Sequence, residues 1–84
     1  MDRNEDSVKT LETILTVEVN HADAHFALGA AYDKIGQGEK AMGHTRSAEN
    51  LFTKENNSFM MAQAAKNLSH FMRKFRPLVN GDSE

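Results

Sequence analysis

Apolar residues recur every three to four positions along most of the chain, a spacing typical of amphipathic α-helices. No stretch alternates apolar and polar residues with a period of two, so the pattern indicates no β-strands. The predicted helices cover residues 5–18, 21–35, 38–54 and 58–75. We therefore expect an all-α fold built from antiparallel helical hairpins.

The predicted breaks between helices carry residues that suit helix ends. Asn20 can accept a hydrogen bond from the first turn of the second helix. Gly36 can end that helix in a left-handed conformation, and Pro77 stops the fourth helix. Gly43 lies inside the third helix, where glycine costs about 1 kcal/mol relative to alanine. We expect another backbone to approach closely at Gly43.

Composition limits the chain to one small domain of modest charge. Its 84 residues include ten basic and twelve acidic side chains, a net charge of −2, and no cysteine. This balance does not favour nucleic acid, and disulfides and cysteine–zinc sites are excluded. The polar start indicates neither a signal peptide nor a membrane span, so we expect a cytoplasmic protein. The helical domain is predicted over residues 6–76, with flexible ends at 1–5 and 77–84.

The most distinctive stretch, Ala22 to Ala48, mixes small and larger apolar residues around a Gly-Gln-Gly turn. It resembles one unit of the tetratricopeptide repeat, a helical hairpin that binds other proteins. The resemblance covers most of residues 6–75, as a full unit over 22–55 between two half-units. It implies a fragment of a right-handed superhelix with about four helices, and a plain helical bundle is the alternative. The strongest matches are Leu28, Gly29, Tyr32, Gly36, Ala41 and Ala48. The departures are Val19, His25, Thr45 and Thr53, where the family prefers proline or aromatic residues.

The resemblance also implies a binding groove, because the first helix of each unit lines the concave face in this family. The matching positions in the second predicted helix are Asp23, Phe26, Ala27, Ala30, Asp33 and Lys34. Those in the fourth are Phe59, Ala62, Gln63, Lys66 and His70. Phe26 and Phe59 lie off the buried stripes of their helices, so we expect them to be partly exposed, as contact residues often are. Packing of Phe26 on the next helix is the alternative.

These positions predict a non-enzymatic adaptor that binds a partner peptide or helix. The groove is apolar at one end and carries Lys34 and Lys66 at the other, which suits a segment with an acidic end. The alternative function is self-association as a homo-oligomer or as a subunit of a larger assembly, because an unpaired first helix would expose Leu11 and Leu15 or their neighbours.

Other chemistries receive little support from the sequence. His21 and His25 have a spacing that can hold a metal, but no carboxylate is fixed beside them, and His44 and His70 look isolated. We therefore expect no metal and no cofactor. No nucleophile with a base, paired carboxylates or phosphate loop is present. The aromatic residues near the basic C-terminal end fall on a buried stripe and cannot stack on bases, so no nucleic acid is expected.

Overall fold

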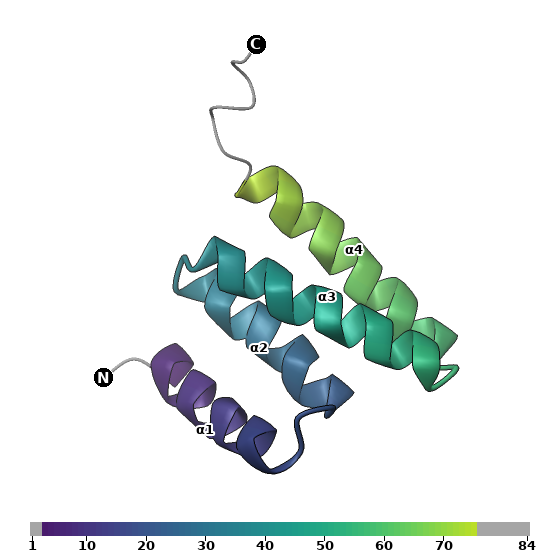
Figure 1. Ribbon diagram of the computed structural model, residues 1–84. Helices are drawn as coiled ribbons and strands as arrows, with labels where there is room; N and C mark the ends of the chain where they lie inside the picture. The colour runs from purple at the N-terminus through teal and green to yellow at the C-terminus, as the bar shows by residue number, and fades with distance from the viewer. Residues whose placement is uncertain (1–2, 76–84) are drawn as a thin grey trace.

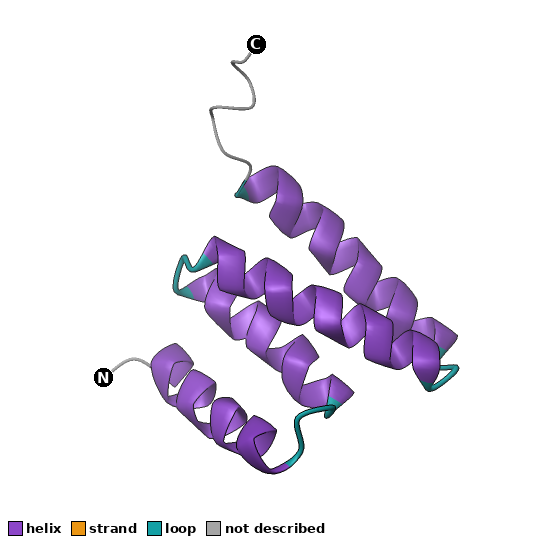
Figure 2. Ribbon diagram, in the orientation of Figure 1, coloured by secondary structure: helices purple, strands orange, loops and turns teal. Residues whose placement is uncertain are grey.

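The computed structural model describes residues 3–75 and consists of four helices that follow one another in space as in the sequence (Figure 1). They are α1 (Arg3–Val17), α2 (Ala22–Lys34), α3 (Gly38–Lys54) and α4 (Ser58–Lys74). Residues 3–75 contain no strand, which confirms the all-α prediction (Figure 2). Each helix packs antiparallel against its predecessor, so α1 and α4 form opposite edges of the stack. No helix of this part of the chain is both long and apolar enough to cross a membrane.

Two of the three turns behave as the sequence predicts. Gly36 has a φ of +79°, the left-handed conformation that ends α2. Asn56 adopts a similar φ of 59°, and the Asn57 side chain then accepts a hydrogen bond from the Met60 N–H at 3.1 Å. This side-chain bond satisfies one of the free backbone donors at the start of α4.

The start of the chain and the first turn differ from the prediction. Helix α1 begins at Arg3, so residues 3–5 belong to a helix and not to a flexible end. The predicted cap at Asn20 is wrong. His21 caps α2 instead, and its Nδ1 accepts a hydrogen bond from the Ala24 N–H at 3.1 Å. The predicted tail over 77–84 lies outside the described residues.

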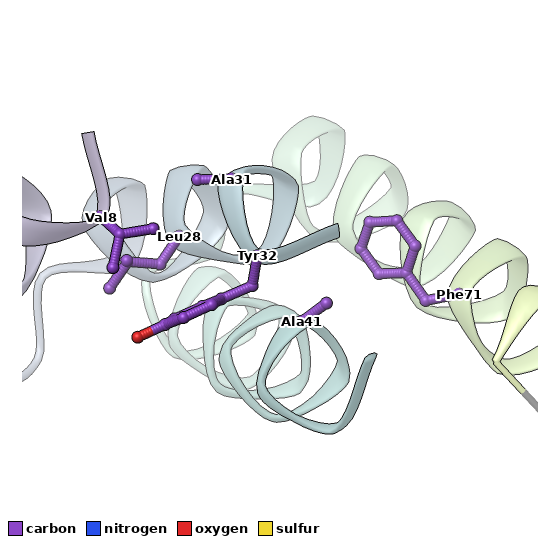
Figure 3. Close-up of a cluster of buried hydrophobic side chains, with 6 residues drawn as sticks. All are labelled: Val8, Leu28, Ala31, Tyr32, Ala41 and Phe71. Carbon is purple, nitrogen blue, oxygen red and sulfur yellow. The ribbon is translucent and has the colours of Figure 1, made fainter. Parts of the chain in front are cut away.

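The core consists of two clusters along the α2–α3 hairpin, one toward the Gly36 turn and one toward its open end. The first contains Val8, Leu28, Ala31, Tyr32, Ala41 and Phe71 (Figure 3). The second contains Ala22, Ala48, Phe52 and Ala64. Helices α2, α3 and α4 contribute to both clusters, whereas α1 reaches only the first, through Val8.

The unpaired side of α1 is apolar, and its exposed residues are neighbours of the two leucines, as the second part of the expectation allowed. Leu11 and Leu15 are half-buried against the first cluster. Ile14 and Val17 are the exposed residues, with 36% and 87% of their surfaces accessible. Helix α1 therefore turns its leucines inward and presents β-branched residues to solvent.

Helices α2 and α3 approach each other closely at Gly29. A Cβ atom there would overlap the Thr45 hydroxyl and lie 3.2 Å from the carbonyl oxygen of Ala41. A Cβ at Gly43 would meet nothing within 4 Å. The close backbone approach predicted at Gly43 is therefore wrong. It occurs at Gly29, where α2 faces α3.

We expect Gly29→Ala and Gly43→Ala to change stability in opposite directions. Overpacking at Gly29 should lower the free energy of unfolding by about 1–3 kcal/mol. The methyl group at Gly43 has free space and favours the helix, so it should raise the free energy by about 0.5–1 kcal/mol. Urea unfolding followed by circular dichroism measures both. Equal effects of the two substitutions would contradict the packing described at Gly29.

Candidate functional site

A groove lies between α1 and α2 at the edge of the stack. It is lined by Asn4, Ser7, Leu11, Ala27, Ala30, Ala31 and Lys34, and its volume is about 210 Å³. The alanines of α2 have short side chains, which leaves room beside α1. Lys34, at the C-terminal end of α2, adds a positive charge to a wall that is apolar on the α2 side and carries the polar side chains of Asn4 and Ser7 on the α1 side.

The hollow surface continues over α1. A second depression of about 360 Å³ is lined by Asp6, Ser7, Thr10 and Leu11. It shares Ser7 and Leu11 with the groove, so the two form one continuous surface. Leu11 is half-buried and lies at their junction, which gives this surface an apolar floor.

The predicted groove residues of α2 separate into three environments. Ala27, Ala30 and Lys34 line the groove. Asp33 is bound to α4 instead, because its carboxylate accepts a hydrogen bond from the Lys74 ammonium at 2.7 Å. Asp23 lies apart, in a polar hollow with Glu18 and Glu55.

Phe26 follows the alternative considered for it and packs on the next helix. Its ring meets that of Phe52 edge-on, with centroids 6.1 Å apart and planes at 70°. Half-buried in this way, Phe26 is attached to the second core cluster, together with Met60 and Met61 of α4.

The predicted residues of α4 do not join the groove. Among the described residues, none that lines the groove comes from α4. Phe59 has 70% of its surface accessible, and Ala62 and Lys66 are also exposed. Gln63 is half-buried, and the exposed His70 lies beside Phe71, with ring centroids 5.8 Å apart. The structure thus places a groove between α1 and α2, where the sequence predicted a face shared by α2 and α4.

A polar network, formed by Glu12, Val19, His25, Tyr32 and His44, was missed by the sequence reasoning. The Tyr32 hydroxyl donates a hydrogen bond to the Glu12 carboxylate. The Tyr32 ring stacks on His44, with centroids 5.6 Å apart and planes within 10°. The Nδ1 atoms of His44 and His25 are 3.0 Å apart, and His25 Nε2 lies 2.9 Å from the Val19 carbonyl oxygen. The network connects α1, the α1–α2 loop, α2 and α3.

The expectation that His44 is isolated is therefore wrong. His25 and His44 lie at similar distances from the turn at Gly36, on the two arms of an antiparallel hairpin. Pairing the arms about that turn would have brought the two residues together. Spacing along one helix, which suggested His21 and His25 as partners, gave no such information.

The environment shifts the pKa values of two members of the network. Burial raises the pKa of Tyr32 to about 12, and the hydrogen bond and negative charge of Glu12 act in the same direction. Burial also lowers the pKa of His44, and the nearby His25 and Lys40 add to that effect while Glu12 opposes it. Within residues 3–75, no three His, Cys, Asp or Glu side chains are arranged to hold a metal ion.

Removal of the Tyr32 hydroxyl should separate the hydrogen bond from the packing of the ring. Tyr32→Phe keeps the stack on His44 but loses the bond to Glu12, which is exposed and can return to water. We expect the free energy of unfolding to fall by about 1 kcal/mol near pH 7. Urea titration of both proteins measures this difference.

The stabilities of the same two proteins should respond differently to alkaline pH. The pKa of Tyr32 is raised from 10.0 to about 12 on folding, so its contribution is complete below pH 10 and is lost as the pH rises toward 12. The stability advantage of the wild type over Tyr32→Phe should therefore shrink above pH 10. A difference that stays constant or grows would show that the Tyr32 pKa is not raised.

Comparison with known proteins does not indicate a function for this chain. No protein family, no curated protein and no solved structure matches this chain. Function is therefore inferred from the groove between α1 and α2 and from the chemistry of the side chains around it.

Proposed function

We propose that the chain is a non-enzymatic interaction module, similar to a tetratricopeptide-repeat adaptor, that binds a partner peptide or helix in the groove between α1 and α2. The observation that carries this proposal is the lining of that groove. Three alanines and Leu11 form the apolar part of its wall, Asn4 and Ser7 the polar part, and Lys34 supplies a charge. Recognition grooves for peptide segments combine apolar, polar and charged groups of this kind.

The lining also defines the chemistry of the occupant. An apolar side chain of the partner would rest on Leu11 between Ala27 and Ala30, where the alanines leave space. A carboxylate of the partner would lie near the Lys34 ammonium. Within the described part of the chain, the groove and the adjoining depression offer the Ser7 and Thr10 hydroxyls but no histidine that could act as their base, which favours binding over catalysis.

A pair of alanine substitutions tests where the partner binds. Ala30 lies in the groove, whereas Ala62 is exposed on α4 outside it. Ala30→Glu fills the groove and places a carboxylate four residues before Lys34, an arrangement that supports the helix. A peptide selected from a random phage-displayed library against the wild-type chain, then synthesised with a fluorophore, serves as the probe. We expect Ala30→Glu to weaken its binding by tenfold or more, about 1.4 kcal/mol, and Ala62→Glu to leave it unchanged.

The two variants also show whether the binding site has been placed on the wrong helices. Loss of binding in Ala62→Glu alone would place the site on α4, where the sequence resemblance predicts part of it. Failure of the library to yield any peptide that binds the folded chain would count against the adaptor function. Circular dichroism of each variant confirms that the helices remain formed.

Self-association is a second candidate function, favoured by the exposed side of α1. Ile14 and Val17 are one helical turn apart, and Val17 has 87% of its surface accessible. A second copy that covered them would remove apolar surface from water. We expect a dimer in light scattering at high concentration to dissociate over a hundredfold dilution. Val17→Lys should weaken the dimer, and this cation suits the C-terminal end of a helix. A strict monomer at all concentrations would exclude this function.

A further inference from the structure

The contact between His25 and His44 defines the positions of their hydrogens. The Val19 carbonyl oxygen can only accept, so His25 Nε2 must carry the hydrogen that it donates. In neutral His25, Nδ1 is then an acceptor. His44 Nδ1, 3.0 Å away, must therefore be the donor.

Of the two protons that this pair of rings can add, only the second breaks the contact between the Nδ1 atoms. A first added proton can bind at His44 Nε2 and leave the hydrogen between the two Nδ1 atoms in place. A second proton puts hydrogens on both Nδ1 atoms, which can then no longer bond to each other. It also makes both rings cationic, with their centroids 5.2 Å apart. The doubly protonated pair is therefore incompatible with the observed geometry.

The surroundings of His44 disfavour its protonation in the folded chain. Glu12 of α1 favours the cation, whereas His25 of α2 and Lys40 of α3 oppose it, and burial of the ring opposes it most strongly. Among the described residues of α4, no group contributes to this balance. The lowered pKa of His44 means that its contribution to stability is complete above about pH 6.5 and is lost as the pH falls below that value.

The pair lies where it can hold α1 in place. It connects the Val19 carbonyl, in the α1–α2 loop, to α3. The Tyr32 ring that stacks on His44 also carries the hydroxyl bound to Glu12 of α1. Helix α1 has one buried apolar residue, Val8, and two half-buried ones, Leu11 and Leu15, so these polar contacts add to a small apolar attachment.

We propose that the His25–His44 pair is an acid-sensitive clasp, which ties the α1–α2 loop to α3 when neutral and releases α1 from the stack when both rings are protonated. The clasp does not depend on what occupies the groove. A metal bridge between the two rings is not supported, because no third ligand in residues 3–75 is arranged with them. The ligand that operates the clasp is the proton.

Hydrogen–deuterium exchange of the full chain tests the clasp. Protection factors, corrected for the intrinsic effect of pH, are compared between α1 and α4 at pH 7.5 and pH 5.5. We expect protection of α1 to fall at the lower pH, by up to about tenfold because pH 5.5 lies one unit below the ordinary histidine pKa of 6.5, and protection of α4 to change much less. Unchanged protection of α1 in the wild type would overturn the proposal.

Two variants show whether His44 is responsible. His44→Phe keeps a flat ring against Tyr32 but cannot bind a proton, so protection of its α1 should fall less between pH 7.5 and pH 5.5 than in the wild type. His70→Gln removes an exposed histidine outside the network and should respond to pH as the wild type does. An equal pH response in the wild type and His44→Phe would rule out the clasp.

A second measurement needs no substitution and covers the case in which His44→Phe does not fold. NMR titration of the wild type follows the ring Cε1–H signals of His25 and His44 together with the α1 amide signals. We expect the α1 amide signals to change over the same pH range as the ring signals of the His25–His44 pair. Changes in α1 that follow neither histidine would contradict the proposal.

Discussion

The close approach of α2 and α3 at Gly29 is the constraint on which the rest of the structure depends. Without a Cβ atom at this position, Thr45 and the backbone of Ala41 can pack directly against α2. This contact sets the register of the hairpin that begins at the Gly36 turn. The register then places Leu28, Tyr32 and Ala41 in one cluster, and it brings His25 to His44. Helices α1 and α4 pack against the two sides of this hairpin, whose register does not depend on them.

The two flanking helices are attached by different forces. Helix α4 contributes buried residues to both core clusters and carries the ion pair between Lys74 and Asp33. Helix α1 contributes to one cluster and depends in addition on the polar network around Tyr32. The groove therefore lies beside the more weakly attached helix. A binding surface in this position can widen for a ligand without disturbing the α2–α3 contact.

The sequence was sufficient for the features that depend on local pattern. The spacing of apolar residues predicted all four helices, and Gly36 marked the end of α2. The errors concern features that depend on which residues face each other. Gly29 and Gly43 both lie in helices, and only the hairpin register shows which of them meets a neighbour. Both Asn20 and His21 have side chains that can accept a cap hydrogen bond, and the path of the loop after Val17 decides between them.

The groove shows the same limit. The resemblance selected one face of α2, and Ala27, Ala30 and Lys34 do lie together. It could not show that α1 would form the opposite wall, or that Asp33 would be engaged by α4. Such pairings depend on how neighbouring helices rotate about their axes as they pack. The spacing of apolar residues shows which face of a helix is buried, but not which residues of the neighbouring helix it meets.

The unequal attachment of the two edges bears on how the chain loses its structure. Proteins open in cooperative units that often coincide with supersecondary motifs. Here α2, α3 and α4 share both core clusters, so we expect them to open as one such unit and α1 as a smaller one. A conformation in which α1 alone has melted keeps the Gly29 contact and the second cluster intact. That partly open form would be a three-helix domain bearing a free N-terminal segment, and proteases would cleave it first near the α1–α2 loop.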